Sequence, residues 1–202
     1  MTAIALKMMK NDLWYEAVNA STKLTQGDII LDCPVVRWAS TPVELKAGHE
    51  VETLRSSIEV ISADVIVITQ ACDLEQDKVA NVILCPHISL DKYKEEWEAA
   101  RRYQGHNPTQ KAWQKTCEDI KNGYLWNLSM LNGGNIENLT LTHRVVDFSD
   151  VYTLPRTFIE SLLQSREQSR LRLCPPYREH LSQAFARFFM RVGLPTGITR
   201  TW

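Results

Sequence analysis

The clearest pattern in the sequence is a pair of continuous apolar runs that flank a short polar segment. Residues 64–69 (DVIVIT) and 79–85 (VANVILC) are rich in β-branched side chains, and Pro86 closes the second run. Such runs are typical of strands that are covered on both faces. Because only the polar residues 70–78 separate them, the two runs are predicted to form an antiparallel hairpin with a long tip.

A shorter apolar run in the first part of the chain predicts another strand. Residues 29–31 follow the turn at Gly27-Asp28, and the apolar pattern continues in an edge-like manner through Val36. Residues 40–57 show neither a helical nor a strand period and are predicted to be a loop. Weak strand signals return over residues 139–148.

Two helices are predicted to interrupt the strands. Ser89 is placed to cap a helix over residues 90–103, and its hydroxyl is expected to accept from the first turn. Thr109 is placed to cap a second helix, which Gly123 ends. The segment 89–123 is therefore predicted to be a helical insertion within the sheet.

Two further helices are predicted in the last part of the chain. Pro155 suits the first turn of a helix over residues 156–166. The last helix is predicted over residues 176–192, where apolar side chains recur at helical spacing and Gly193 follows. This helix is expected to pack on the sheet and close the core.

Together these segments predict an α+β fold. The expected form is a small curved antiparallel sheet or an SH3-like partial barrel, with inserted helices and a C-terminal packing helix. A chain of 202 residues has the size of one domain, so residues 1–202 are predicted to form a single domain. A hydrophobic content of 44% and a charged content of 23% are those of a packed globular protein.

The charge is small overall and unevenly distributed. A net charge of −1 argues against a protein that coats nucleic acid or membranes nonspecifically. Residues 1–155 hold 15 Lys and Arg against 21 Asp and Glu, whereas residues 156–202 hold eight Arg, no Lys and three Glu. These arginines could form internal ion pairs, dock an acidic partner or contact phosphates.

The sequence predicts a cytoplasmic protein. Lys7 interrupts the apolar residues at 1–10, which do not resemble a signal peptide, and no apolar run approaches the ~20 residues that a membrane helix needs. The five cysteines are odd in number, widely spaced and form no C-x-x-C motif. Reduced thiols in the cytosol are therefore expected.

Cys72 is the one weak candidate for a catalytic residue. It follows a buried strand, where a rigid scaffold often presents a nucleophile. The antiparallel pairing, however, is expected to place His87 near Asp64, at the far end of the hairpin. The carboxylate of Asp73 also opposes formation of a thiolate beside it. A buried structural cysteine is therefore the favoured interpretation.

An acidic cluster at Asp73, Glu75 and Asp77 occupies the hairpin tip. It could hold Mg²⁺ or Ca²⁺, but it lacks the glycine and the final glutamate of an EF-hand loop. A solvated turn and an internal ion pair are the alternatives. The favoured prediction is that Asp73 or Glu75 contacts an arginine of the last helix.

The basic face of that helix supplies the other predicted binding residues. Arg178, Arg187 and Arg191 could bind the acidic tip, an acidic partner or phosphates. The aromatic residues between them have a helical period that marks them as core, so nucleic-acid binding is possible but is not favoured. No cofactor is predicted. No metal site is predicted either, because Cys85 and His87 lack further zinc ligands at short spacing.

Two segments resemble a family of uncharacterised bacterial proteins. They are residues 69–75 (TQACDLE), with the strand that follows, and residues 175–195 (PPYREHLSQAFARFFMRVGLP), and the opening at Gly27-Asp28 also agrees. The resemblance covers about half of the chain and implies no reaction.

A second resemblance is topological. A Gly-Asp turn before an apolar strand, followed by a strand pair and a later helix, is similar to the SH3-like barrel of MazF/PemK-type toxins. That resemblance implies a barrel-like fold. It does not transfer the ribonuclease residues, because Ser62-Ala63-Asp64 stands where those toxins have an Arg-Pro turn.

These observations favour a non-catalytic accessory protein that acts by binding another protein, in a bacterial stress or phage-defence system. No complete catalytic constellation is present, and the asymmetric charge suits a protein partner. The alternatives are an RNA-cleaving, toxin-like protein and a thiol-dependent hydrolase that uses Cys72. No membrane partner is expected.

Overall fold

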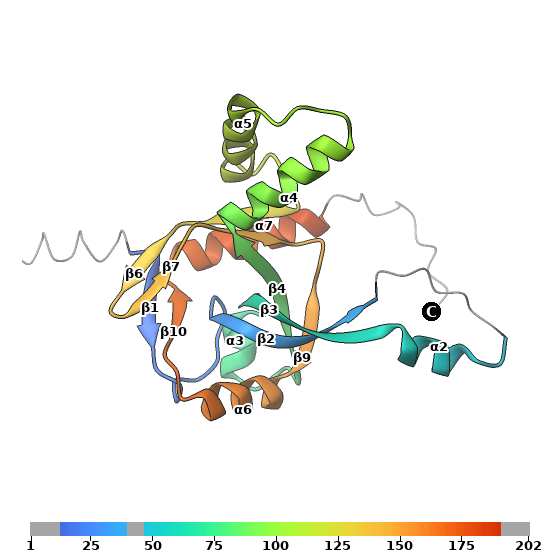
Figure 1. Cartoon of the computed structure of the whole chain (residues 1–202). Coiled ribbons are helices and arrows are strands. Elements are labelled where there is room, and N and C mark those ends of the chain that lie inside the picture. The colour runs from blue at the N-terminus through green and yellow to red at the C-terminus, as the bar shows by residue number, and fades with distance from the viewer. Residues whose placement is uncertain (1–12, 40–46, 191–202) are drawn as a thin grey trace, which may run out of the picture.

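The computed structural model describes residues 13–39 and 47–190 and has an α+β fold (Figure 1). Its elements are β1 (Tyr15–Val18), β2 (Ile29–Trp38), α2 (Glu50–Ser56), β3 (Ile58–Val67), α3 (Ala71–Glu75), β4 (Asn81–Ser89), α4 (Leu90–Tyr103), α5 (Gln110–Lys121), β5 (Leu128–Leu131), β6 (Gly134–Ile136), β7 (Leu139–Leu141), β8 (Arg144–Asp147), β9 (Tyr152–Pro155), α6 (Arg156–Arg166), β10 (Arg170–Leu173) and α7 (Tyr177–Phe189).

The predicted hairpin forms the centre of a curved, open antiparallel sheet. Its order is β2-β3-β4-β8-β5. The edge of β4 that faces away from β3 pairs with two strands: residues 81–84 pair with β9, and residues 87–89 pair with β8. Ile66 of β3 lies opposite Cys85 of β4, which confirms the pairing expected from the two apolar runs. The described strands form no closed barrel, so the curved-sheet form of the prediction is the one observed.

Both faces of the hairpin are buried, as its continuous apolar runs predict. Val65 and Val67 of β3 point into one apolar cluster, which Ile159 of α6 completes. The alternate residue Ile66 points into a second cluster, which contains Leu181 of α7. Figure 1 accordingly shows α6 and α7 on opposite sides of the central strands.

The inserted helices have the predicted caps. The Ser89 hydroxyl accepts from the backbone N–H of Lys92, and the Thr109 hydroxyl accepts from Ala112. Both bonds satisfy donors that the first turn of a helix leaves free. A third apolar cluster around Ile120 connects α5 to the sheet.

Several local predictions are wrong or incomplete. Residues 50–56 form α2, so the loop predicted over 40–57 is wrong there, and residues 40–46 of that prediction lie outside the described residues. Strand β3 begins six residues before the predicted start at residue 64, and His87 lies inside β4 rather than after it. The helix predicted over 176–192 is described as Tyr177–Phe189, and its predicted end lies outside the described residues.

A buried ion cluster joins the Gly27-Asp28 turn to the C-terminal part of the chain. Asp28 is fully buried, and its carboxylate accepts from the side chains of Arg170 and Arg172 on β10 and from the backbone N–H of Thr25. Arg170 also donates to the backbone carbonyl of Thr22. The uneven charge of the sequence is therefore partly balanced inside the fold.

Candidate functional site

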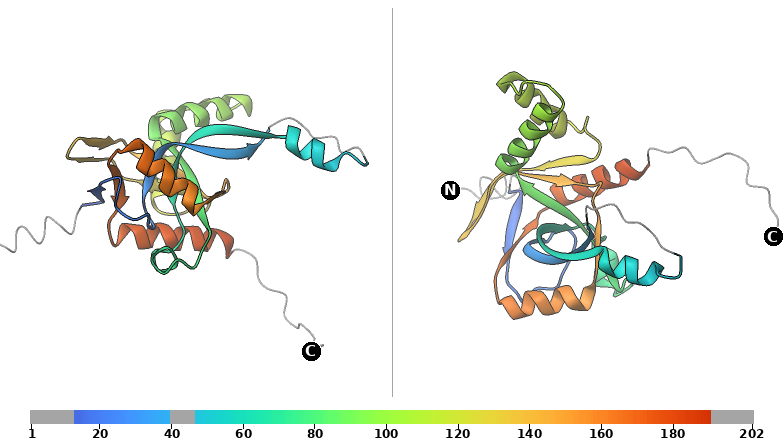
Figure 2. Two further views of the ribbon diagram at one scale, coloured as in Figure 1. Left: turned by 90° about the horizontal axis from the view of Figure 1, so that it is seen from below. Right: turned by 45° about the vertical axis from the view of Figure 1, so that its right-hand side comes forward.

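Several exposed apolar side chains gather on an arm formed by the outer parts of β2 and β3, with α2 at its tip. Only residues 65–67 of β3 pair with β4, so residues 58–63 pair with β2 alone. The arm extends away from the body of the molecule in Figure 1 and in the left view of Figure 2. Residues 58–63 of β3 and 34–38 of β2 thus each have one edge that pairs with no other described strand.

One face of the arm is apolar and exposed. Val36 lies directly opposite Val60, and Trp38 lies opposite Ile58. Their exposed fractions are 50%, 73%, 62% and 43%, in that order. Side chains that face one another in this way have Cβ atoms about 5 Å apart, so the four form one continuous surface. We call these four residues the arm face.

The opposite face of the same strands is covered or polar. Val35 is fully buried, and Ile61 packs against the core cluster beneath it. Farther out, Arg37 and Glu59 form an ion pair across the strands. Because successive side chains of a strand point to opposite faces, the charged pair lies on one side of the arm and the arm face carries no charged side chain.

The tip of the arm adds further exposed apolar surface. The backbone N–H of Ala39 donates to the carbonyl of Ser57 and ties the end of β2 to the start of β3. Helix α2 has no buried residue, and it exposes Val51 and Leu54, which are three positions apart and so lie on one side of the helix. Exposed apolar side chains that gather in this way mark protein-interaction surfaces.

Cys72 does not have the surroundings of a catalytic thiol. It is exposed on the short helix α3, so the interpretation as a buried structural cysteine is wrong. Its Sγ lies 3.7 Å from Oε1 of Gln70 and 3.8 Å from the carboxylate of Asp73. No described histidine forms a hydrogen bond with it, and the sequence predicted this separation from His87 correctly.

The acidic tip makes a different ion pair from the predicted one. Among the described residues, neither Asp73 nor Glu75 forms an ion pair with an arginine of the last helix. The acid of this tip that does reach an arginine is Asp77, which pairs with Arg156 at the start of α6. Arg156 also donates to Glu160, so it links the tip to α6.

The described arginines of the predicted basic face contact other side chains of the same chain. Arg178 donates to Glu179, its neighbour in α7, and Arg187 lies over the ring of Trp126 at 5.4 Å from the centroid. Arg191 lies outside the described residues. Side chains that already have internal partners are weaker candidates for binding phosphates.

A polar cluster that the sequence did not predict lies where β3, β4 and β8 meet. Arg144 of β8 donates from Nε to Nδ1 of His87 at 2.9 Å, and from Nη2 to the carboxylate of Asp64. His87 is only 2% exposed, and burial, helped by the nearby Arg144, lowers its pKa to about 3. The ring is therefore neutral. The sequence did indicate the proximity of His87 to Asp64, but it gave no signal for Arg144.

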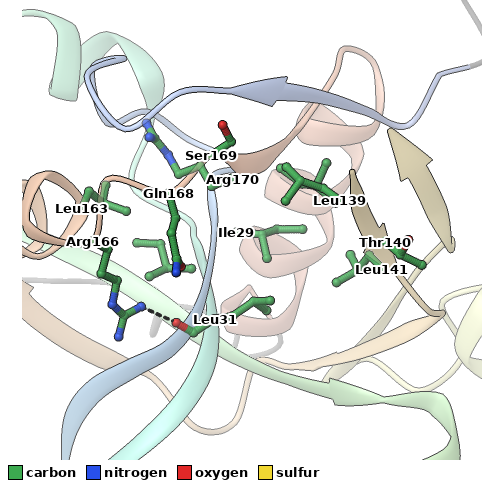
Figure 3. A pocket seen from close by; sticks show the side chains of 12 residues that line it. Ile29, Leu31, Leu139, Thr140, Leu141, Leu163, Arg166, Gln168, Ser169 and Arg170 are labelled. Carbon is green, nitrogen blue, oxygen red and sulfur yellow. Dashed lines mark hydrogen bonds between the residues drawn. The ribbon is translucent and has the colours of Figure 1, made fainter. Parts of the chain in front are cut away.

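Figure 3 shows a small apolar pocket between β2, β7 and the segment that joins α6 to β10. Ile29, Leu139 and Leu141 line it, and Arg166 lies at its side, donating to the backbone carbonyl of Leu31. Its volume is about 150 Å³. Ligand pockets for small molecules usually measure roughly 300–1,000 Å³, so this pocket suits at most one small apolar group.

The described residues contain no group of three or more His, Cys, Asp or Glu side chains placed to hold a metal ion. None of the described helices is both long and apolar enough to cross a membrane. In comparisons with known proteins, no family model, no curated protein and no solved structure matches this chain.

Proposed function

We propose that this protein is a non-catalytic accessory protein that binds another protein through the arm face. The observation that carries the proposal is the pair of directly opposed, exposed apolar residues on that face, Val36 with Val60 and Trp38 with Ile58. Apolar surface on an element that projects into solvent costs free energy unless a partner covers it. A tryptophan in such a surface is a typical centre of binding energy.

The partner is a different protein with an apolar surface, rather than a second copy of the chain. The arm face presents on the order of 400 Å² of apolar surface. Two copies stacked on this face alone would bury about 800 Å² in total, below the ~1,000 Å² of a stable interface. A partner that also covers the open strand edges and α2 would bury more.

An extended segment of the partner suits these edges. The outer edge of each arm strand offers backbone N–H and C=O groups that pair with no other described strand. A strand added there would gain backbone hydrogen bonds while its apolar side chains extend the arm face. The ion pair of Arg37 with Glu59 lies on the opposite side and would stay in solvent.

The test is affinity capture from the native host with the wild type and Val60→Glu. Glutamate at this position would bury an unpaired charge in the interface, so partner recovery is expected to fall by on the order of 100-fold. Folding should be unaffected, because Val60 is exposed. Circular dichroism and thermal unfolding check this point.

The matched control is Tyr103→Glu, which makes the same kind of change at the 94% exposed end of α4. This variant should recover the partner as well as the wild type does. Equal recovery with Val60→Glu and with the wild type would contradict the proposal. If light scattering shows that the wild-type chain forms a dimer and that Val60→Glu dissociates it, the partner is a second copy of the chain and not a different protein.

A further inference from the structure

A polar cleft lies at the base of the arm, on the side where α4 begins. It has a volume of about 400 Å³, within the range of small-molecule sites. Its walls come from β2, β3, β4, β8 and the first turn of α4. Five charged residues from four of these elements line it: Asp32, Arg37, Asp64, Lys92 and Arg144. Arg37 forms its ion pair with Glu59. None of the four arm-face residues lines the cleft, although Arg37 of β2 and residues 61–63 of β3 do.

Arg144 is held in a fixed orientation at this cleft. Its Nε donates to Nδ1 of His87 and its Nη2 to Asp64, as described above. Asp64 is fixed in turn, because its other oxygen accepts from the backbone N–H of Asp32 at 3.0 Å. The remaining nitrogen of Arg144, Nη1, donates to none of the described residues. A guanidinium held by two partners keeps this third donor available without further ordering.

Two more donors line the cleft at the start of α4. Lys92 is exposed, and its ammonium group forms no ion pair with a described residue. The Ser89 hydroxyl accepts from the backbone N–H of Lys92 and donates its proton to no described residue. Arg144, Lys92 and Ser89 thus offer donors of the kind that bind phosphate oxygens.

The carboxylate of Asp32 gives the cleft a second chemical character. Asp32 is exposed and lines the same cleft, and no described side chain forms an ion pair with it. A carboxylate repels a phosphate group but accepts hydrogen bonds from hydroxyl or amino groups. The cleft therefore offers donors for an anion and, beside them, an acceptor for neutral donors.

We propose that this cleft binds an organic phosphate whose carrier bears hydroxyl or amino groups, as a nucleoside monophosphate does. The phosphate contacts Nη1 of Arg144, the ammonium group of Lys92 and the Ser89 hydroxyl. The hydroxyl or amino groups of the carrier donate to Asp32. The volume of about 400 Å³ accommodates such a molecule.

The test is isothermal titration calorimetry at low salt, with adenosine monophosphate and inorganic phosphate as separate probes. Adenosine monophosphate is expected to bind at one site per chain and more tightly than inorganic phosphate. Lys92→Ala should weaken its binding about tenfold, since it removes one charge-assisted contact. Lys111→Ala, an exposed position at the start of α5, should leave the affinity unchanged.

Asp32→Asn separates the two halves of the proposed site. Asparagine tolerates the positive φ of 50° at this position, so the backbone should be preserved. This variant should bind inorganic phosphate more tightly than the wild type does, because a repulsive charge is lost. The ratio of its affinity for adenosine monophosphate to its affinity for inorganic phosphate should be lower than in the wild type, because the acceptor for the carrier is weakened. No binding of either probe, or equal affinities for Lys92→Ala and Lys111→Ala, would overturn the proposal.

Discussion

Replacing Asp28 by alanine is expected to destabilise the protein by about 3–5 kcal/mol, the usual effect of removing one partner of a buried ion pair. The carboxylate of Asp28 is fully buried and neutralises two arginines of β10, Arg170 and Arg172. Without it, two positive charges would lie close together with little water to screen them. The backbone N–H of Thr25 would also lose its acceptor.

Urea unfolding followed by circular dichroism measures this loss directly. Glu59→Gln is the matched control, because it breaks the Arg37–Glu59 pair, whose side chains are about half exposed. Exposed pairs contribute less than about 1 kcal/mol, so this variant should unfold close to the wild type. Similar free energies of unfolding for Asp28→Ala and Glu59→Gln would show that the buried cluster does not hold β10 in place.

The second large effect is expected from pH. Burial lowers the pKa of His87 to about 3, from an ordinary value near 6.5. Between these two values the unfolded chain binds a proton that the folded protein does not. Stability must therefore fall as the pH drops below 6.5, and this contribution levels off near pH 3. Between pH 7 and pH 4, His87 alone should lower the free energy of unfolding by on the order of 3 kcal/mol.

Carboxylates titrate in the same range, so the measurement is a comparison of variants. The free energy of unfolding is determined at pH 7 and at pH 4 for the wild type, His87→Gln and His143→Gln. Glutamine can still accept from Arg144 but does not titrate, so His87→Gln should lose much less stability on acidification. His143 is exposed, and its replacement should leave the pH dependence as in the wild type. An unchanged pH dependence in His87→Gln would contradict the assigned neutral, buried ring.

The parts of the fold that local chemistry determines could be predicted from the sequence. The hairpin of β3 and β4 follows from two β-branched runs, and the starts of α4 and α5 follow from Ser89 and Thr109. In each case the signal lies within a few residues of the structure that it predicts. The antiparallel pairing of the hairpin then placed His87 away from Cys72.

The candidate surfaces depend on information that the sequence does not hold locally. Val36 and Val60 have side chains like those of the buried residues around them. Their exposure results from β4 pairing with only the last part of β3, a long-range choice. Arg144 meets Asp64 across 80 positions of the chain, so no spacing rule could indicate it.

The charge asymmetry illustrates the same limit. The C-terminal arginines were candidates for an external partner, yet Arg156, Arg170, Arg172 and Arg178 form ion pairs within the molecule. Which acids they meet is decided by the tertiary fold, because Asp28 and Asp77 lie far from them in the sequence. Internal pairing was one of the interpretations that composition left open.

The most direct test of the arm face is photo-crosslinking in living cells of the native host. A photoreactive amino acid replaces Val60 in one variant and Glu59, its neighbour on the opposite face, in another. We expect one discrete crosslinked protein, different from this chain, from position 60 and little or none from position 59. Equal crosslinking from both positions, or none from position 60, would contradict the proposal that the arm face binds a partner.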